Sequence, residues 1–349
     1  MKYYACLAVA MSSIAVAQNI SPWKFAISGD SRNCGDIVMP AIASGVRKSG
    51  ASFYWHLGDF RAIYAVDEDI LPPAQLGLHG RKLNMSGYQA NAWPDFIAHQ
   101  IAPFGDFPVY LIPGNHETIP PVTRAAYLAQ FADWLDTPLL REQRFKDDPQ
   151  DHGLRAYYHW VQGNVDFIAL DNASADQFDP AQLSWLRALL QRDETSGNIR
   201  TIVVGMHAAL PGSIGHSHSM GDWPLGDKSG REVYEALWHT QEATHKRVYV
   251  FASHSHFFME NIFQTPDWKG KLLPGWIIGS AGAVRYRLPP ETSPAQNAMT
   301  DVYGYMVATV GPDGTISTSF KRLTLNDLLY ANPNVPETLV HWCWEQNKQ

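Results

Sequence analysis

The chain has 349 residues, of which 45% are hydrophobic and 17% are charged, and this composition is ordinary for a folded globular protein. A chain of this length buries a core large enough to support a precise active site. The formal charge is −7 and the Lys and Arg residues are scattered, so the sequence argues against a nucleic-acid-binding module.

The N-terminus is typical of a targeting segment. Lys2 supplies a positive charge, residues 5–16 are mostly apolar, and Ala15-Val16-Ala17 places small residues where a signal peptidase cuts. The sequence therefore predicts a signal peptide over residues 1–17 and a secreted or periplasmic protein. The alternative interpretation is a buried N-terminal strand or helix. The apolar run is shorter than the roughly 20 residues of a membrane span, and we expect no such span elsewhere.

Removal of the signal peptide leaves two cysteines, Cys34 and Cys343. They either form one disulfide or remain free thiols, and the sequence does not decide between these states. No CxxC spacing is present, so a cysteine-based metal site is excluded.

Short apolar runs recur along the chain, and each ends in glycine or a polar residue, as buried strands do. The runs cover residues 25–28, 53–57, 109–112, 201–204 and 248–251. Past their ends lie, in order, Asp30, Asp59, Asn115 with His116, His207, and His254 with His256. Because ligands in open α/β sheets bind beyond the carboxyl ends of the strands, we expect these polar side chains to converge.

Helices are predicted between the strands. The clearest covers residues 180–191, where Asp179 is the N-cap and Pro180 takes the first helical position. Weaker helical patterns cover residues 91–101 and 123–135.

The polar or Pro/Gly-rich segments 61–90 and 137–153 predict long loops that shape access to a site. Residues 305–310 and 316–323 flank a Gly-Pro-Asp-Gly turn and predict a hairpin. Residues 18–349 contain no repeat or linker and predict a single domain. Its core covers about residues 24–325, and the tail 326–349 is expected to pack on the outside.

The order Gly-Asp, Gly-Asp, Gly-Asn-His-Glu, strand-end His and His-x-His resembles the calcineurin-like metallophosphoesterase superfamily, which includes the purple acid phosphatases. The resemblance runs from about residue 25 to 310, and its most specific part, Gly114-Asn115-His116-Glu117, matches the GNH[DE] motif. It implies an α/β fold of two packed mixed β-sheets flanked by helices, a four-layer architecture. It also implies a two-metal site at the C-terminal ends of the strands.

The resemblance assigns a role to each strand-end residue. Asp59 is the carboxylate shared by both ions, and His116 is the acid at the leaving oxygen. One ion has the further ligands Asn115, His207 and His254. The other ion has the further ligands Asp30 and His256. Carboxylate, amide and imidazole ligands suit Zn, Fe or Mn ions. Two such ions would polarise a phosphoryl group and activate a water for attack.

Three positions depart from the family's pattern. Arg32 stands where the family often has a histidine ligand, and a guanidinium offers only donors. Ala62 stands where purple acid phosphatases have their iron-binding Tyr, so no iron-tyrosinate is expected, and Tyr64 is a poor substitute. Ser253 replaces a usual glycine. The second ion therefore has an incomplete ligand set and is expected to bind weakly. Arg32 either grips a substrate phosphate or supports Asp30 in a salt bridge.

A second histidine pair competes for the last motif. Gly215-His216-Ser217-His218 matches the family's GHxH pattern, but no strand precedes it. We therefore assign the ligands to His254 and His256 and expect His218 to reach substrate. His56, His99 and His239 are interpreted as structural.

Three functions remain open from the sequence. The leading one is a metal-dependent hydrolase of phosphate mono- or diesters. The alternatives are a hydrolase of another ester or anhydride on the same dinuclear site, and a non-catalytic metal-binding protein with a decayed site. The sequence names neither the substrate nor the oligomeric state.

Overall fold

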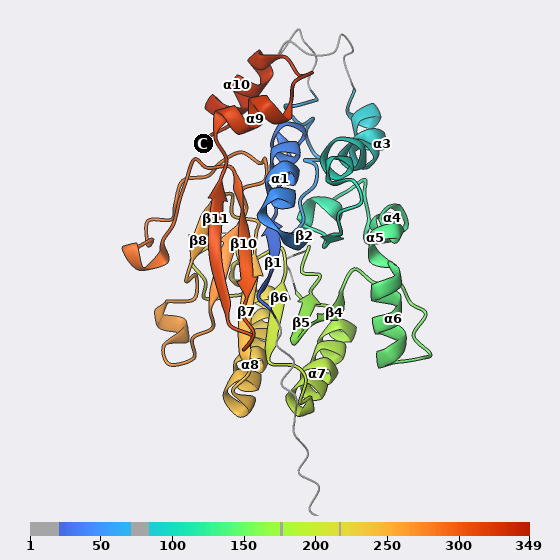
Figure 1. The fold of residues 1–349 in the computed structure, drawn as a ribbon, viewed down its shortest axis with the longest axis vertical. Coiled ribbons are helices and arrows are strands. Elements are labelled where there is room, and N and C mark those ends of the chain that lie inside the picture. The colour runs from blue at the N-terminus through green and yellow to red at the C-terminus, as the bar shows by residue number, and fades with distance from the viewer. Residues whose placement is uncertain (1–20, 71–83, 175–176, 216–217) are drawn as a thin grey trace, which may run out of the picture.

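Two β-sheets lie face to face in the computed structural model, which describes residues 21–70, 84–174, 177–215 and 218–349 (Figure 1). The predicted signal peptide over residues 1–17 lies outside this part of the chain. No helix among the described residues is long and apolar enough to cross a membrane.

The first sheet has five strands in the order β11-β10-β1-β2-β3. The strands are β1 (Trp23–Ser28), β2 (Ala51–His56), β3 (Val109–Leu111), β10 (Gly304–Val310) and β11 (Ile316–Arg322). β1, β2 and β3 run parallel, whereas β10 is antiparallel to both of its neighbours. β10 and β11 form the hairpin that the sequence predicted.

The second sheet has six strands in the order β4-β5-β6-β7-β9-β8. The strands are β4 (Tyr158–Gln162), β5 (Val165–Ala169), β6 (Thr201–Gly205), β7 (Arg247–Ala252), β8 (Phe258–Glu260) and β9 (Gly275–Ile278). β5, β6, β7 and β9 run parallel, and the edge strands β4 and β8 are antiparallel. Both sheets are therefore mixed, as expected.

A core rich in aromatic residues fills the space between the sheets. Phe25 of β1 meets Phe167 of β5 edge to face, with ring centroids 5.1 Å apart, and Trp55 of β2 packs in the same way on Trp160 of β4 at 5.2 Å. β1, β2, β4 and β5 thus direct large side chains to the inner face, as sheet packing requires. This core fixes one sheet against the other and so sets the positions of their strand ends.

Helices cover the outer face of each sheet. α1 (Gly35–Ser49) and α3 (Met85–Phe96), which continues as a π-helical turn over Ile97–Ile101, share a hydrophobic core with the first sheet. α7 (Pro180–Thr195) and α8 (Pro224–Thr244) share another with the second sheet. The arrangement is a four-layer α/β architecture, which confirms the expected fold class.

The remaining helices lie in the connections and the tail. They are α4 (Arg124–Gln130), α5 (Ala132–Leu135), α6 (Pro138–Asp147), α9 (Leu325–Ala331) and α10 (Glu337–Glu345). Short 3₁₀ turns cover Ala102–Phe104, Asn115–Glu117, Met220–Asp222, Pro266–Trp268 and Pro294–Gln296.

Two of the predicted loops contain helices. α6 begins directly after Thr137, whose side chain accepts a hydrogen bond from the Leu140 amide, with Pro138 at the first helical position. Leu140 is its only buried residue and most of its side chains are polar, so it lacks the apolar stripe from which a helix is inferred. The predicted loop over residues 61–90 is likewise too long, because Asn84 caps α3 and the helix begins at Met85.

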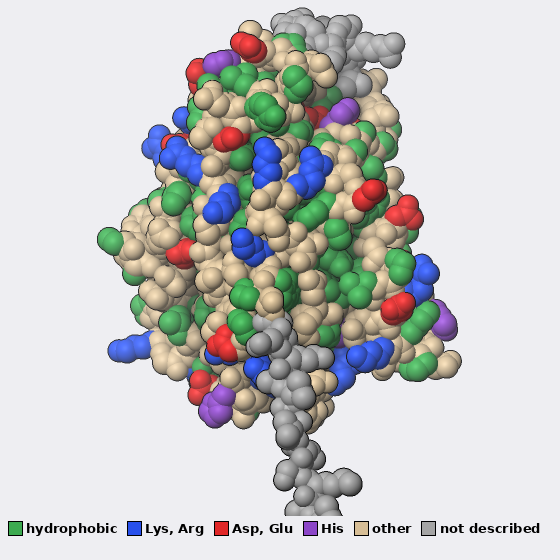
Figure 2. Space-filling model, in the orientation of Figure 1, with side chains coloured by type: hydrophobic (Ala, Val, Ile, Leu, Met, Phe, Trp, Pro, Cys, Tyr) green, Lys and Arg blue, Asp and Glu red, His purple; other side chains and the backbone are tan. Residues whose placement is uncertain are grey.

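The tail is tied to the rest of the chain by a disulfide between Cys34 and Cys343, which settles the pairing that the sequence left open. In Figure 1 the tail helices α9 and α10 lie beside one end of α1. Trp342 and Trp344 are partly buried against the core that includes α1. Figure 2 shows both basic and acidic side chains spread over the face that carries β10 and β11.

Candidate metal centre

The predicted ligands lie just past the ends of five strands and come from both sheets. Asp30, Asp59 and Asn115 follow β1, β2 and β3 of the first sheet, whereas His207, His254 and His256 follow β6 and β7 of the second. The packing of the sheets therefore brings together residues that are far apart in the chain.

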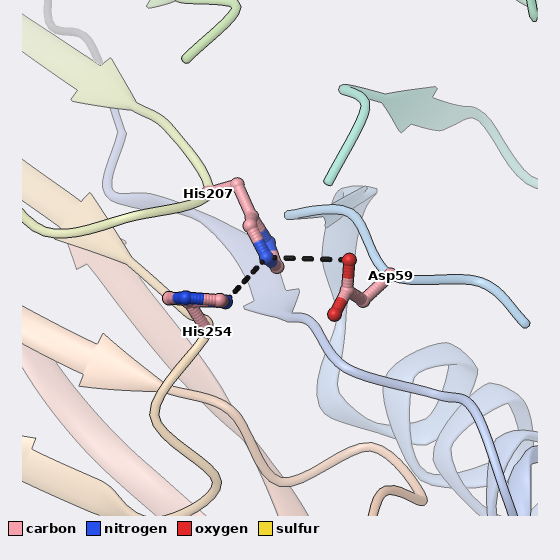
Figure 3. Close-up of side chains that lie close together, drawn as sticks. All are labelled: Asp59, His207 and His254. Carbon is pink, nitrogen blue, oxygen red and sulfur yellow. Dashed lines mark hydrogen bonds and ion pairs between the residues drawn. The ribbon is translucent and has the colours of Figure 1, made fainter. Parts of the chain in front are cut away.

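A first group is formed by Asp59, His207 and His254, which each offer a ligand atom within 4.8 Å of the others. Figure 3 shows the three side chains pointing toward one another from separate loops. The Nε2 atom of His207 lies 3.3 Å from Asp59 Oδ1 and 3.0 Å from His254 Nδ1. Asn115 joins this group, because its Oδ1 lies 3.0 Å from the same nitrogen. All four predicted ligands of the first ion are thus assembled.

The tautomer of His207 shows what this group requires. Its Nδ1 donates a hydrogen bond to the carbonyl oxygen of Leu57 at 2.8 Å, so Nε2 of the neutral ring carries a lone pair. That lone pair faces the acceptor oxygens of Asp59 and Asn115, an arrangement that is unfavourable until a positive charge lies between them. A backbone carbonyl that orients a ligating histidine in this way is typical of metal sites. The first group therefore fits a metal ion.

A second group is formed by Asp30, Asp59 and His256, whose ligand atoms also lie within 4.8 Å of one another. The Nδ1 of His256 donates to the Val284 carbonyl at 2.7 Å, and its Nε2 lies 3.4 Å from Asp30 Oδ1. Two carboxylate oxygens here, Asp30 Oδ1 and Asp59 Oδ2, are buried without a hydrogen-bond partner among the described residues. This group also has the oxygens and nitrogen that a cation would neutralise.

Burial and hydrogen bonding set the ionisation of these groups. Burial lowers the pKa of both His254 and His256, so their rings are neutral at pH 7. Burial alone would raise the pKa of Asp30, but the neighbouring His256 and His207 and the hydroxyl of Ser253 together hold that pKa well below the usual range. Asp30, His254 and His256 are therefore presented in their deprotonated, metal-binding form.

Three of these residues have a strained backbone. Asp30, Asp59 and His254 adopt φ angles of 61°, 60° and 67°, in the left-handed region that non-glycine residues rarely occupy. Each such residue costs on the order of 1–3 kcal/mol and persists only when its surroundings impose it. Backbone strain of this kind clusters at functional sites, and here it occurs at three candidate ligands that lie close together.

A buried glutamate holds two of the strand-end loops together. Glu117 accepts hydrogen bonds from the backbone amides of Asp59, Phe60 and Gly114 at 2.7–2.9 Å. Gly114 allows the close approach, because a Cβ there would lie 2.2 Å from Asp59 Oδ1. The motif residue Glu117 thus positions the shared carboxylate rather than reaching the ligand site.

The predicted acid, His116, lies beside the shared carboxylate. Its Nδ1 donates to the Ala62 carbonyl at 2.5 Å, and its Nε2 lies 3.6 Å from Asp59 Oδ2. The exposed ring of Tyr64 covers it, with centroids 5.1 Å apart. Burial lowers the pKa of His116. The ring is therefore oriented with Nε2 toward the site.

The position that departs from the family's pattern, Arg32, is also at the site. Only 7% of the residue is exposed, and its Nε lies 3.6 Å from Asp59 Oδ2 while Nη2 lies 3.2 Å from His256 Nε2. No ion pair to Asp30 is found among the described residues. The alternative of a direct salt bridge supporting Asp30 is therefore wrong, and the guanidinium contacts Asp59 instead.

The serine in place of the family's glycine has a specific contact. The Ser253 hydroxyl donates a hydrogen bond to Asp30 Oδ2, which also accepts from the His254 amide at 2.7 Å. This serine requires glycine opposite, since a Cβ on Gly29 would lie 2.2 Å from Ser253 Oγ. The substitution is accommodated, and it fixes the orientation of Asp30.

His218 lies at the same end of the sheets. Its ring is 5.0 Å from that of His254 and 5.1 Å from that of Tyr286. The other half of that motif, His216, lies outside the described residues. The structure thus places His254 and His256 in the two groups and His218 next to His254.

Sequence reasoning missed several contributors. Tyr286 stacks on His256 with centroids 3.9 Å apart, and its hydroxyl accepts from Arg32 at 3.4 Å. Asn172 accepts from the backbone amide of His207 at 3.0 Å and so fixes that loop. Asn172 follows the apolar run 165–169 and was detectable as another strand end, whereas nothing in the sequence singles out Tyr286.

A buried charge cluster supports the loop after β2. The fully buried Arg61 forms ion pairs with Asp36, Asp67, Asp69 and Asp95.

His56 is fully buried near the site, and its Nε2 shares a hydrogen bond with the Ser31 hydroxyl at 2.9 Å. Burial lowers the pKa of His56 to about 3, which agrees with a structural role.

Comparisons with known proteins give likenesses in structure but not in sequence. No protein-family model and no curated protein sequence matches the chain. A purple acid phosphatase from yellow lupin (Lupinus luteus) seeds is similar over 86% of this chain at 14% identity, with a TM-score of 0.56. The match spans 52% of the lupin chain, so this chain covers about half of that protein.

Two further solved structures are similar. PhoD matches over 89% of this chain and 73% of its own, with 16% identity and a TM-score of 0.53. GAP50, the anchor in the inner membrane complex of Plasmodium, matches over 87% of this chain and 85% of its own, with 12% identity and a TM-score of 0.50. At such low identities these likenesses establish the fold alone. The chain therefore has a metallophosphoesterase-like fold, with two groups of candidate metal ligands where its strands end.

Proposed function

We propose that the chain is a metal-dependent hydrolase of phosphate mono- or diesters. The observation that carries the proposal is the convergence of Asp59, Asn115, His207 and His254, whose acceptor atoms face one another. Zn, Fe or Mn ions suit these ligands, and Asp30, Asp59 and His256 mark the position that a second ion would take. A bound ion would polarise a phosphoryl oxygen and lower the pKa of a coordinated water.

The chain's own residues supply positioning and a proton. In hydrolysis a water oxygen forms a bond to phosphorus, the ester P–O bond breaks, and the leaving oxygen takes a proton. We assign that proton to Nε2 of His116 in its doubly protonated form, since Nδ1 stays bonded to the Ala62 carbonyl, and the proton that the attacking water loses restores the ring. Arg32 and His218 are proposed to contact the substrate, with Arg32 neutralising phosphate charge.

We also propose that residues 1–17 are removed on export and that residues 18–349 form a single catalytic domain. The disulfide between Cys34 and Cys343 supports an oxidising compartment, where such bonds persist. The secreted or periplasmic location is proposed on these grounds.

The proposal is tested by removing and restoring metal. The mature protein is treated with a chelator, dialysed, and assayed on chromogenic phosphate monoesters, phosphate diesters, carboxylate esters and sulfate esters. We expect phosphate ester hydrolysis to disappear and to return with Zn²⁺, Mn²⁺ or Fe. Hydrolysis of only the carboxylate or sulfate esters would favour the second function, and no hydrolysis with metal bound would favour a binding protein.

A matched pair of variants locates the activity. His207→Ala should lose bound metal and activity together, because it removes a ligand of the first group. His239→Ala alters an exposed histidine on α8 and should keep both. Equal activity of the two variants would place the reaction elsewhere in the molecule.

A further inference from the structure

The guanidinium of Arg32 touches two of the three members of the second candidate group. Its Nη2 lies 3.2 Å from His256 Nε2 and its Nε lies 3.6 Å from Asp59 Oδ2. It therefore reaches the same lone pair and the same carboxylate oxygen that would bind a second ion.

The contact with His256 has a defined direction. Because Nδ1 of this ring donates to the Val284 carbonyl, Nε2 is an acceptor in the neutral ring. The guanidinium, which has five N–H groups and keeps its proton in proteins, is the donor. Arg32 thus satisfies this nitrogen as a cation would.

Arg32 is held in this position from the open side as well. Its Nη1 donates to the Tyr64 hydroxyl at 3.1 Å, and its Nη2 reaches the Tyr286 hydroxyl at 3.4 Å. Tyr286 itself stacks on His256. A side chain with these contacts and 7% exposure is fixed in place, unlike a surface arginine.

We propose that the Arg32 guanidinium replaces the second metal ion, so that the chain holds one ion at Asp59, Asn115, His207 and His254. A second ion would have to share its ligands with a permanent positive charge of the same sign. The guanidinium then supplies the second positive charge beside the substrate phosphate. This inference rests on the proposed function, since it concerns the same site.

Unused donors leave Arg32 able to bind phosphate. Its contacts with Tyr64, Tyr286 and His256 use three of its five N–H groups, and no described residue accepts from the buried Nε. A phosphate oxygen near Asp59 would find at least one donor free. An arginine used in this way gives directed hydrogen bonds as well as charge.

Metal content tests the inference without relying on activity. Metal-free wild type, Arg32→His, Arg32→Ala and the control Arg187→Ala are each dialysed against excess Zn²⁺, and bound zinc per chain is counted by plasma mass spectrometry. Arg187 is exposed on α7 and pairs with Glu232, outside the site. We expect one zinc in wild type and control, and a second in Arg32→His, which supplies an imidazole and removes the guanidinium.

The outcomes separate the two proposals. Two zinc ions in wild type would overturn this inference and leave the proposed function intact, whereas no bound metal after dialysis against Zn²⁺, Mn²⁺ or Fe would remove the proposed function too. A single zinc in both Arg32→His and Arg32→Ala, with unchanged circular dichroism melting, would show that the guanidinium is not what excludes the second ion.

Inhibition by inorganic phosphate gives an independent readout. Arg32→Ala should raise the inhibition constant of phosphate about 10- to 100-fold, the loss expected for a hydrogen bond between charged groups. Arg32→Lys keeps the charge without the planar fork and should fall between. An inhibition constant that is equal in wild type, Arg32→Ala and Arg187→Ala would overturn the phosphate contact.

Discussion

Two backbone carbonyls, those of Leu57 and Val284, determine which atom each central histidine offers. Leu57 accepts from His207 and Val284 accepts from His256, so both rings present Nε2 to the site. Neither carbonyl belongs to a motif, yet each fixes a tautomer, and the tautomer decides whether a ring binds a cation. The atom that each histidine offers to a cation is therefore set by backbone groups that contact the ligands and are not ligands themselves.

Replacing His116 tests its role as the acid. His116→Ala should lower kcat about 10²- to 10⁴-fold for esters with poor leaving groups, because the departing oxygen then leaves without a proton. The loss should be much smaller for 4-nitrophenyl esters, whose leaving group needs no protonation. The measurement is kcat across a series of leaving groups, with zinc content determined on the same samples.

His239→Ala is the matched control, since His239 is exposed on α8, away from both groups of candidate ligands. A uniform loss across the leaving-group series would contradict the acid role and indicate a positioning role instead. Loss of zinc from His116→Ala would show that the variant acts through the metal ligands.

At the scale of elements, the strands that carry ligands were predictable and the side-chain contacts between loops were not. The runs before Asp30, Asp59, Asn115, His207 and His254 are short, apolar and followed by polar residues, which is a local signal. The contact between Arg32 and Tyr286 joins loops far apart in sequence, and its geometry follows only from the packing of the two sheets. α6 was missed for a different reason, because an exposed helix lacks the apolar period.

The sequence analysis also missed the hairpin of β4 and β5. This hairpin contains a buried pair of titratable residues, His159 and Asp166. His159 of β4 lies 2.8 Å from Asp166 of β5 and also pairs with Asp147 of α6. Burial alone would lower the pKa of His159, but the two carboxylates outweigh it and raise the pKa to about 9. Three elements are thus joined through one protonated ring.

The raised pKa of His159 makes stability depend on pH. Below the unfolded value of about 6.5 the ring is protonated in both states and the contribution is fully present, and it is lost as pH rises toward 9. A difference of this size corresponds to at most about 3 kcal/mol of the free energy of unfolding. Urea unfolding of metal-free protein at pH 6 and pH 9.5 should show this loss in wild type.

In His159→Gln the loss between these pH values should be clearly smaller. It should not vanish, because Asp193, whose pKa is raised to about 8 by burial and by Asp166, adds a loss of the same sign. The exposed His239→Gln serves as control and should behave as wild type. Equal pH dependence in His159→Gln and wild type would contradict the assignment.

At the scale of the whole molecule, the candidate site exists only when both sheets are packed. The first sheet supplies Asp30, Asp59 and Asn115, and the second supplies His207, His254 and His256. The aromatic core between them is therefore what sets the ligand distances. Sequence order alone could indicate that the ligands belong to one site. It could not show that Asp59 belongs to both groups or that Arg32 contacts it.

The last whole-molecule feature is the disulfide between Cys34 and Cys343, which joins residues 309 apart in sequence. Cys34 directly precedes α1, and Cys343 lies in α10, whose terminal carbonyls also accept hydrogen bonds from Arg285. Closing so long a loop reduces the entropy of the unfolded chain, so the double variant Cys34→Ser/Cys343→Ser should lose about 2–5 kcal/mol of the free energy of unfolding. Urea unfolding with and without dithiothreitol measures this: reductant should bring wild type to the level of the variant and leave the variant unchanged. Wild type that unfolds at the same urea concentration under both conditions would show that the bond contributes no stability and that the tail is held by packing alone.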